Sequence, residues 1–187
     1  LIDGGGSVYN GTGYDVGENV VLPYLVKRGI HRLDAVIVSH EHGDHTQGLL
    51  AVLDTLQVDS LFQSSCIEGS EPYYSQLIRI AEKRKVPVRI LKAGDTLSIG
   101  SEVRMKVLFP EDAAEDNGDK TNPNNQSLVM RMEYQGMSML FTGDLESLME
   151  ERLLNQDIEK VDVLKVAHHG SRTSTTQEWL NRLDPEV

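Results

Sequence analysis

Metal-binding side chains are concentrated in the stretch SHEHGDHTQG, residues 39–48. Three histidines and one aspartate fall within six positions, with the spacing His40-x-His42-x-Asp44-His45. Imidazole nitrogens and carboxylate oxygens are ligands of Zn²⁺ and related divalent cations, and such cations can activate water for hydrolysis. The spacing therefore predicts a metal site.

The preceding apolar run AVIVS predicts a buried strand that delivers His40 at its carboxyl end. Residues i and i+2 of an extended chain point the same way, so His40 and His42 can face one ion. Asp44 and His45 follow where the chain enters a helix, and they can face a second ion. Gly43 is expected to allow a tight turn between the two pairs.

A helix is expected at 46–57, directly after this motif, with Thr46 as its cap. Other helices are predicted at 17–29, 72–85, 146–156 and 175–183. Pro23 should bend the first helix or mark a boundary in it. Strands are predicted at 33–40, 86–92, 103–109, 127–134, 137–144 and 161–169, and a long loop at 110–125.

Two other predicted strands also end in residues able to bind metal. MSMLFTGD ends in Asp144, and VDVLKVAHHGS ends in His168 and His169. Groups that carry function often lie at strand ends and in the loops after them. Asp144 alone would more often be a helix cap. We favour His168 as a ligand, because it is nearest the strand end, and His169 as an orienting group or substrate contact. His31, apart from both clusters, is interpreted as a surface or satisfied core residue.

The length, composition and charge of the chain limit the classes of protein to which it can belong. With 187 residues, 39% hydrophobic and 25% charged, the chain predicts a single soluble domain over residues 1–187. The net charge of −11 argues against a broad DNA-binding face, although residues 79–106 carry a local excess of basic side chains. That excess is more simply the solvated face of a helix. The single cysteine, Cys66, excludes an internal disulfide.

The ends of the sequence suggest a fragment. LIDGGGS at the start resembles the end of a strand, and LDPEV at the end stops where another strand could begin. We therefore expect an excised and slightly truncated part of a larger protein. Strand pairs mixed with helices favour an α/β fold of two packed sheets flanked by helices.

The motifs together resemble the metallo-β-lactamase superfamily: Asp3 in LIDGGG, the run from His40 to His45, Asp144 in TGD and His168 in AHHGS. The resemblance implies an αββα sandwich of two mixed β-sheets with up to two divalent cations, Zn²⁺ or Mn²⁺. It further implies a ligand set: His40 and His42 for the first cation, Asp44, His45 and His168 for the second, Asp144 bridging them, and Asp3 supporting the metal loop.

A closer resemblance is to the carboxyl-terminal domain of the ComEC competence-protein family. It is carried by YDVGENVVLPYLVKRGIHRLDAVIVSHEHGDH, NNQSLVMRMEYQGMSMLFTGDLE and VDVLKVAHHGSRTST. The resemblance implies a metal-dependent nuclease that degrades DNA, most concretely the non-transported strand, during natural transformation. It also implies a soluble domain at the extracytoplasmic face of a membrane-embedded parent, with the membrane channel and other competence proteins as partners.

Two positions depart from these patterns. Many superfamily members have another histidine between the first cluster and the bridging aspartate, whereas here none occurs between His45 and His168. Asn124 or Asn125 lies in about the right region, and an amide oxygen is a weaker ligand. Many ComEC relatives carry aspartate where this chain has His42, so at this position the chain is nearer the superfamily pattern.

Under the nuclease hypothesis, Asp44 also orients the attacking water, and His169 or a hydroxyl of GSRTST assists the leaving group. Asn124, Ser171 and Arg172 are the candidate substrate contacts, with Arg172 on a phosphate. One alternative is a hydrolase of another ester, a thioester, a lactone or a lactam on the same scaffold. Another is a non-catalytic module that guides DNA or docks a partner.

Overall fold

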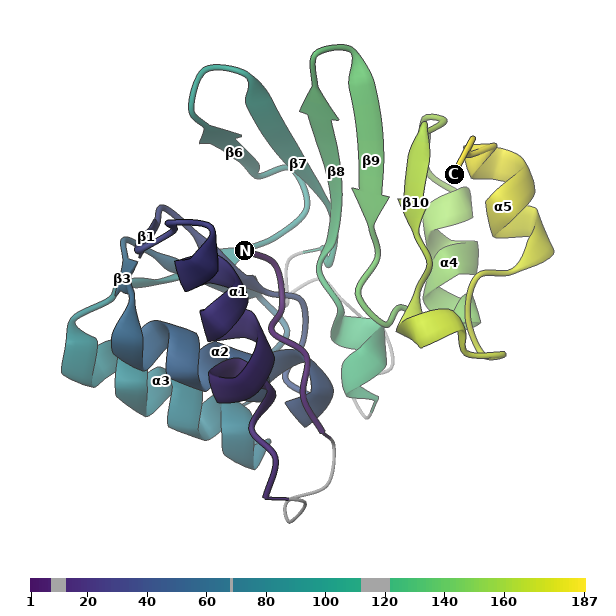
Figure 1. The fold of residues 1–187 in the computed structure, drawn as a ribbon. Helices are drawn as coiled ribbons and strands as arrows, with labels where there is room; N and C mark the ends of the chain where they lie inside the picture. The colour runs from purple at the N-terminus through teal and green to yellow at the C-terminus, as the bar shows by residue number, and fades with distance from the viewer. Residues whose placement is uncertain (8–12, 68, 112–121) are drawn as a thin grey trace. The chain divides into compact units, whose positions relative to one another are not determined.

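The computed structural model describes residues 1–7, 13–67, 69–111 and 122–187, and these form two compact units (Figure 1). The first unit comprises residues 1–63 and 67–90, and the second comprises residues 64–66 and 91–187. Most of the loop predicted at 110–125 lies outside the described residues. None of the described helices is long and apolar enough to cross a membrane.

The first unit contains a three-stranded sheet, a two-stranded sheet and the helices that cover them. The three-stranded sheet has the order β2-β4-β5, with β2 parallel to β4, and the small sheet pairs β1 with β3 in parallel. Its elements are η1 (Gly17–Val21, a π-helical turn), α1 (Leu22–Lys27), β1 (Arg32–Leu33), β2 (Val36–Val38), α2 (Gly43–Thr55), β3 (Gln57–Val58), β4 (Leu61–Ser64), α3 (Pro72–Arg84) and β5 (Val88–Leu91).

The strand that precedes the histidine motif is buried along its whole length. Val36, Ile37 and Val38 of β2 are at most 1% exposed, and such continuous burial is typical of a strand covered on both faces. The apolar faces of α2 and α3 form one core with β2 and β4. That core contains Val36, Val38, Leu49, Leu50, Leu53, Val58, Leu61, Tyr74, Leu77, Ala81 and Val86.

Two glycines bring the amino-terminal segment against α2. Ile2 forms a parallel bridge with Ile37, which places the next residues beside the start of the helix. Gly4 N–H donates to the His45 carbonyl (2.8 Å), and Gly48 N–H donates to the Gly5 carbonyl (2.9 Å). A Cβ at Gly48 would lie 2.0 Å from the Gly4 carbonyl oxygen, so this approach requires glycine.

The second unit is a five-stranded sheet with two helices against one of its faces. Its order is β10-β9-β8-β7-β6, in which β10 and β9 are parallel and the other neighbours antiparallel. Its elements are β6 (Thr96–Ile99), β7 (Val103–Phe109), η2 (Pro123–Gln126), β8 (Val129–Tyr134), β9 (Met137–Phe141), α4 (Ser147–Leu154), β10 (Val163–Lys165), η3 (His168–Gly170) and α5 (Gln177–Leu183).

A separate core joins this sheet to its helices. Trp179 of α5 is fully buried against residues of α4 and of β9 and β10, and α4 and α5 lie beside β10 in Figure 1. The cluster contains Phe109, Val129, Leu140, Leu145, Met149, Leu153, Ile158, Val161, Leu164, Trp179 and Leu183. The strands β9 and β10 are thereby fixed, and the residues that follow each of them leave the sheet at the same edge because the two strands are parallel.

The sequence located most elements but misplaced their ends. All five predicted helices and all six predicted strands are present, and β7 has the predicted bounds. Pro23 lies in the first turn of α1, directly after the π-helical turn, which confirms the predicted boundary. The sequence did not predict β1, β3, β4 and β6 as separate strands, and each of them is only two to four residues long.

Two predictions about the start of α2 are wrong. The helix begins at Gly43 rather than at 46, and Thr46 is not its cap: it lies inside the first turn, where its hydroxyl donates to the His42 carbonyl (3.0 Å). Gly43 has an ordinary helical backbone, so it is not needed for a tight turn. A Cβ there would lie 2.6 Å from the Ser7 carbonyl oxygen, and this tertiary contact is what requires glycine.

The glycine contact gives a test of the fold. Replacing a helical glycine with alanine would by propensity alone stabilise a protein by up to about 1 kcal/mol. We expect Gly48→Ala instead to lower the free energy of unfolding by at least about 2 kcal/mol, because the new methyl group overlaps backbone atoms. Thermal unfolding should show a midpoint lower by roughly 4–8 °C.

The control is Thr55→Ala at the exposed end of the same helix, which changes propensity without an overlap. A midpoint for Gly48→Ala at or above that of the parent would show that the amino-terminal segment does not pack on α2 in this way.

Candidate metal centre

His40 and His42 lie in the segment between β2 and α2. His40 is fully buried, and its Nε2 lies 3.1 Å from Nδ1 of His42. Two nitrogens bound to one tetrahedral zinc ion at about 2.1 Å would lie about 3.4 Å apart. The two rings therefore already have a separation at which they can serve one cation.

Asp3 fixes the orientation of His45. Its Oδ1 accepts from Ser39 N–H (2.8 Å), and its Oδ2 accepts from the Ser39 hydroxyl (2.8 Å) and lies 2.8 Å from Nδ1 of His45. Because an ionised carboxylate only accepts hydrogen bonds, His45 must donate from Nδ1. Nε2 then carries the lone pair that a cation requires, as in the carboxylate–histidine pairs of metal sites.

The same reasoning applies to His40. The Ser39 hydroxyl gives its one proton to Asp3, so its oxygen accepts from Nδ1 of His40, which lies 3.1 Å away. His40 therefore presents the lone pair on Nε2, the nitrogen that faces His42. One aspartate thus sets the proton positions of two of the three histidines in the motif.

Glu41 is a residue of this centre that the sequence analysis missed. It is 2% exposed, and its carboxylate accepts from Gly69 N–H (2.7 Å), Ser70 N–H (3.1 Å) and the Ser70 hydroxyl (2.8 Å). These hydrogen bonds therefore join the segment that carries His40 and His42 to the segment before α3. The position of Glu41 between His40 and His42 was the one sign in the sequence of a role at this centre. Its hydrogen-bond partners, however, are known only from the fold.

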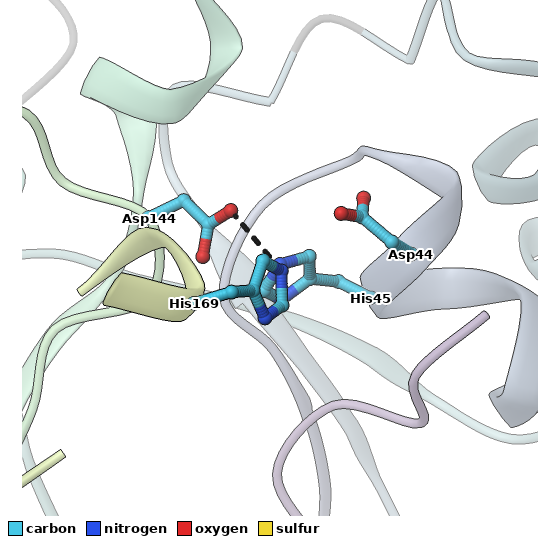
Figure 2. A group of neighbouring side chains, drawn as sticks. All are labelled: Asp44, His45, Asp144 and His169. Carbon is cyan, nitrogen blue, oxygen red and sulfur yellow. Dashed lines mark ion pairs between the residues drawn. The ribbon is translucent and has the colours of Figure 1, made fainter. Parts of the chain in front are cut away.

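Asp44 and His45 lie in the first turn of α2 (Figure 2). His45 is buried, whereas Asp44 is partly exposed. An acidic side chain is favoured at a helix amino terminus, so Asp44 is suited to this position without any metal. Both predicted ligands therefore lie inside the helix, at the point of entry that the sequence predicted.

Asp144 follows β9 in the second unit and is 1% exposed. Its Oδ2 lies 3.5 Å from Nε2 of His169 (dashed in Figure 2) and 3.9 Å from Nε2 of His168. The alternative role of helix cap is wrong, because α4 begins at Ser147 and Glu146 is its cap residue. The structure thus brings together Asp144 and both histidines of AHHGS.

The backbone of the histidine pair is strained. His168, His169 and Gly170 all have positive φ (50°, 51° and 79°), which costs about 1–3 kcal/mol for each non-glycine residue. His168 N–H donates to the Gly143 carbonyl (3.2 Å), which joins the turn to the segment that carries Asp144. Strain of this kind is common where side chains must point in an imposed direction.

Glu150 stabilises the loop after this turn. It is 1% exposed, and its carboxylate accepts from the backbone N–H groups of Thr175 (2.5 Å) and Thr176 (2.9 Å). Thr175 itself has a positive φ of 57°. A buried carboxylate on α4 therefore holds the loop in a conformation that its sequence would not favour locally.

The predicted substrate contacts differ in exposure. Asn124 is buried, and its Nδ2 donates to Glu146 (3.1 Å) while its Oδ1 accepts no hydrogen bond from the part of the chain that is described. Ser171 Oγ lies 3.0 Å from Thr173 Oγ1, and Arg172 is exposed. The three roles stay predictions, as does the choice between His168 and His169 as ligand.

The donor set of both units fits divalent cations. Imidazole and carboxylate groups are present in each unit, and Asp3 supports His45 as metal-site carboxylates support their histidines. Mixed nitrogen and oxygen donors suit Zn²⁺ and Mn²⁺ alike.

Two curated proteins are similar in sequence to most of this chain. The chain is 37% identical over 175 residues to ComE operon protein 3 of Bacillus subtilis (strain 168), a match that covers 93% of this chain and 22% of that protein. It is 28% identical over 172 residues to Competence protein ComA of Neisseria gonorrhoeae, with 89% and 21% covered. The predicted resemblance to ComEC-family competence proteins is thus confirmed, and the chain spans about a fifth of the length of these curated relatives.

A solved structure supports the fold assignment. The crystal structure of CmlA, a diiron β-hydroxylase from Streptomyces venezuelae, has a TM-score of 0.52 and 15% identity, and covers 83% of this chain and 34% of that chain. The family model described as "Beta-lactamase superfamily domain" matches residues 11–177. Because this match includes nearly all of the chain, the protein belongs to the β-lactamase superfamily and has the metallo-β-lactamase fold that its histidine and aspartate motifs predict.

Proposed function

We propose that this chain is a metal-dependent phosphodiesterase that hydrolyses DNA. The observation that carries the proposal is the set of oriented donors: His40 and His42 at 3.1 Å, His45 held by Asp3, and Asp144 beside the histidine pair. Superfamily membership adds the scaffold on which such donors are used. One relative is named a competence protein and another, from Haemophilus influenzae, Recombination protein 2.

The proposed ligands are those that the superfamily resemblance implies. His40 and His42 would hold one cation, Asp44 and His45 with His168 would hold the other, and Asp144 would bridge them. When bound, two cations of this kind would supply Lewis-acid activation of water and neutralise charge on a phosphate. Zn²⁺ and Mn²⁺ are the candidate ions.

The chain's own groups would position the reactants. In the proposed reaction a water oxygen bonds to phosphorus, and the bond from phosphorus to the leaving sugar oxygen breaks. Asp44 would orient the water and accept its proton, and His169, which is exposed, would donate a proton to the leaving oxygen. Arg172 and Ser171 would contact phosphate oxygens, and Asn124 would contact the substrate or complete the first cation's ligands.

The names and greater length of the relatives support a proposal for the setting of the reaction. We propose that the parent protein is membrane-embedded and that this domain degrades the non-transported DNA strand at the extracytoplasmic face. The channel part of the parent and other competence proteins would be its partners. Cleavage of a lactam, thioester or lactone with DNA left intact would instead favour another hydrolase on this scaffold.

Asp44 gives the first test of function. We expect Asp44→Asn to lower the rate of DNA hydrolysis by about 10²–10⁴-fold, because the amide cannot accept the proton of water. The measurement is cleavage of labelled single- and double-stranded DNA in the presence of Mn²⁺ or Zn²⁺.

The matched control is Asp54→Asn on the same helix. Asp54 is 49% exposed and forms an ion pair with the exposed Lys83 (3.1 Å), so its loss should leave the rate within about twofold. Equal, measurable rates for Asp44→Asn and the parent would contradict the role of Asp44, whereas no cleavage by the parent would favour a non-catalytic, DNA-guiding module.

Metal content gives the second test. We expect elemental analysis to find two divalent ions per chain, fewer in Asp144→Asn, and a loss of hydrolysis on chelation that Mn²⁺ or Zn²⁺ reverses. An anomalous-scattering map should place these ions beside His40 and beside His45. Ions that contact the first unit but not Asp144 would contradict the proposed bridging role.

A further inference from the structure

A hydrogen-bonded chain begins at His168 and ends at a carboxylate. His168 Nδ1 lies 3.1 Å from the hydroxyl of Thr173, and that hydroxyl donates to Oε1 of Glu146 (3.5 Å). Nδ1 of His168 is itself 3.5 Å from the same Glu146 oxygen. Neither Glu146 nor Thr173 was singled out by the sequence.

Glu146 is held in place as an acceptor. Its Oε2 accepts from Asn122 Nδ2 (3.0 Å) and its Oε1 from Asn124 Nδ2 (3.1 Å), while its N–H donates to Asn125 Oδ1 (3.3 Å). Because an ionised carboxylate has no proton to donate, Thr173 must donate to it. The direction of the hydrogen bond between Thr173 and Glu146 is thereby fixed.

The direction of the next hydrogen bond follows. Thr173 has one hydroxyl proton, which goes to Glu146, so its oxygen can only accept from His168. Ser171 Oγ, 3.0 Å from the same oxygen, is then a second donor to it. His168 must carry its proton on Nδ1, and the lone pair lies on Nε2, the nitrogen nearer Asp144.

We propose that Glu146 and Thr173 are positioning residues that hold His168 as its Nδ1–H tautomer, so that Nε2 is its ligand atom. An exposed neutral histidine favours the opposite tautomer in water, so the protein must impose this one. In the first unit Asp3 does the same for His45 directly, whereas here the hydroxyl of Thr173 transmits the effect. The ligand role rests on the proposed function; the tautomer is a property of the metal-free protein.

Nitrogen-15 NMR of the metal-free protein tests the tautomer. The parent should show His168 with Nδ1 protonated. Thr173→Val removes the hydroxyl and keeps the shape of the side chain, and it should shift His168 toward Nε2 protonation, whereas Thr173→Ser should retain the parent signal. An unchanged tautomer in Thr173→Val would overturn the proposal.

Metal affinity gives an independent readout. Competition with a chelator should show Zn²⁺ bound about 10–100-fold more weakly by Thr173→Val than by the parent, and Thr173→Ser should restore most of the affinity. Thr96→Val, an exposed threonine on β6, is the control and should bind as the parent does. Because Thr173 is exposed, we expect the unfolding midpoints to agree within about 2 °C.

The outcomes separate this inference from the proposed function. A shifted tautomer and weaker Zn²⁺ binding in Thr173→Val, with no hydrolysis of DNA by the parent, would support the positioning role and contradict the nuclease. Hydrolysis of DNA by the parent with unchanged Zn²⁺ affinity in Thr173→Val would overturn the positioning role alone.

Discussion

The first half of the candidate centre depends on the carboxylate of Asp3. It accepts hydrogen bonds from the backbone and hydroxyl of Ser39 and from Nδ1 of His45, so it joins the amino-terminal segment, the end of β2 and the start of α2. Each of these partners is more than thirty residues away in sequence. The carboxylate reaches them because Gly4 and Gly48 allow two backbones to pack without side chains between them.

Buried carboxylates have a common structural role in both units. Glu41 accepts from two backbone N–H groups before α3, and Glu150 accepts from two in the loop before α5. Each satisfies N–H groups that would otherwise be costly to bury, and each fixes a loop beside predicted ligands. Part of the chain's strong negative charge therefore organises loops, and does not act only as a solvated surface.

The two units orient their histidines by related means. Carboxylates determine which ring nitrogen carries the proton, directly for His45 and through hydroxyls for His40 and His168. Since only the nitrogen without a proton can bind a cation, these contacts select the donor atoms before any ion arrives. A preorganised site of this kind avoids the cost of reorienting ligands on binding.

The sequence alone indicated the candidate ligands, the strands that lead to them and the superfamily, because the motif His40-x-His42-x-Asp44-His45 and the apolar runs are local patterns. It did not determine that α2 begins at Gly43, since that glycine is required by contact with the distant carbonyl of Ser7. Nor did it identify Glu41, Glu146 or Thr173, because glutamate and threonine are common residues on protein surfaces. Their roles arise from hydrogen bonds to residues remote in the chain, and only the folded backbone decides which donor meets which acceptor.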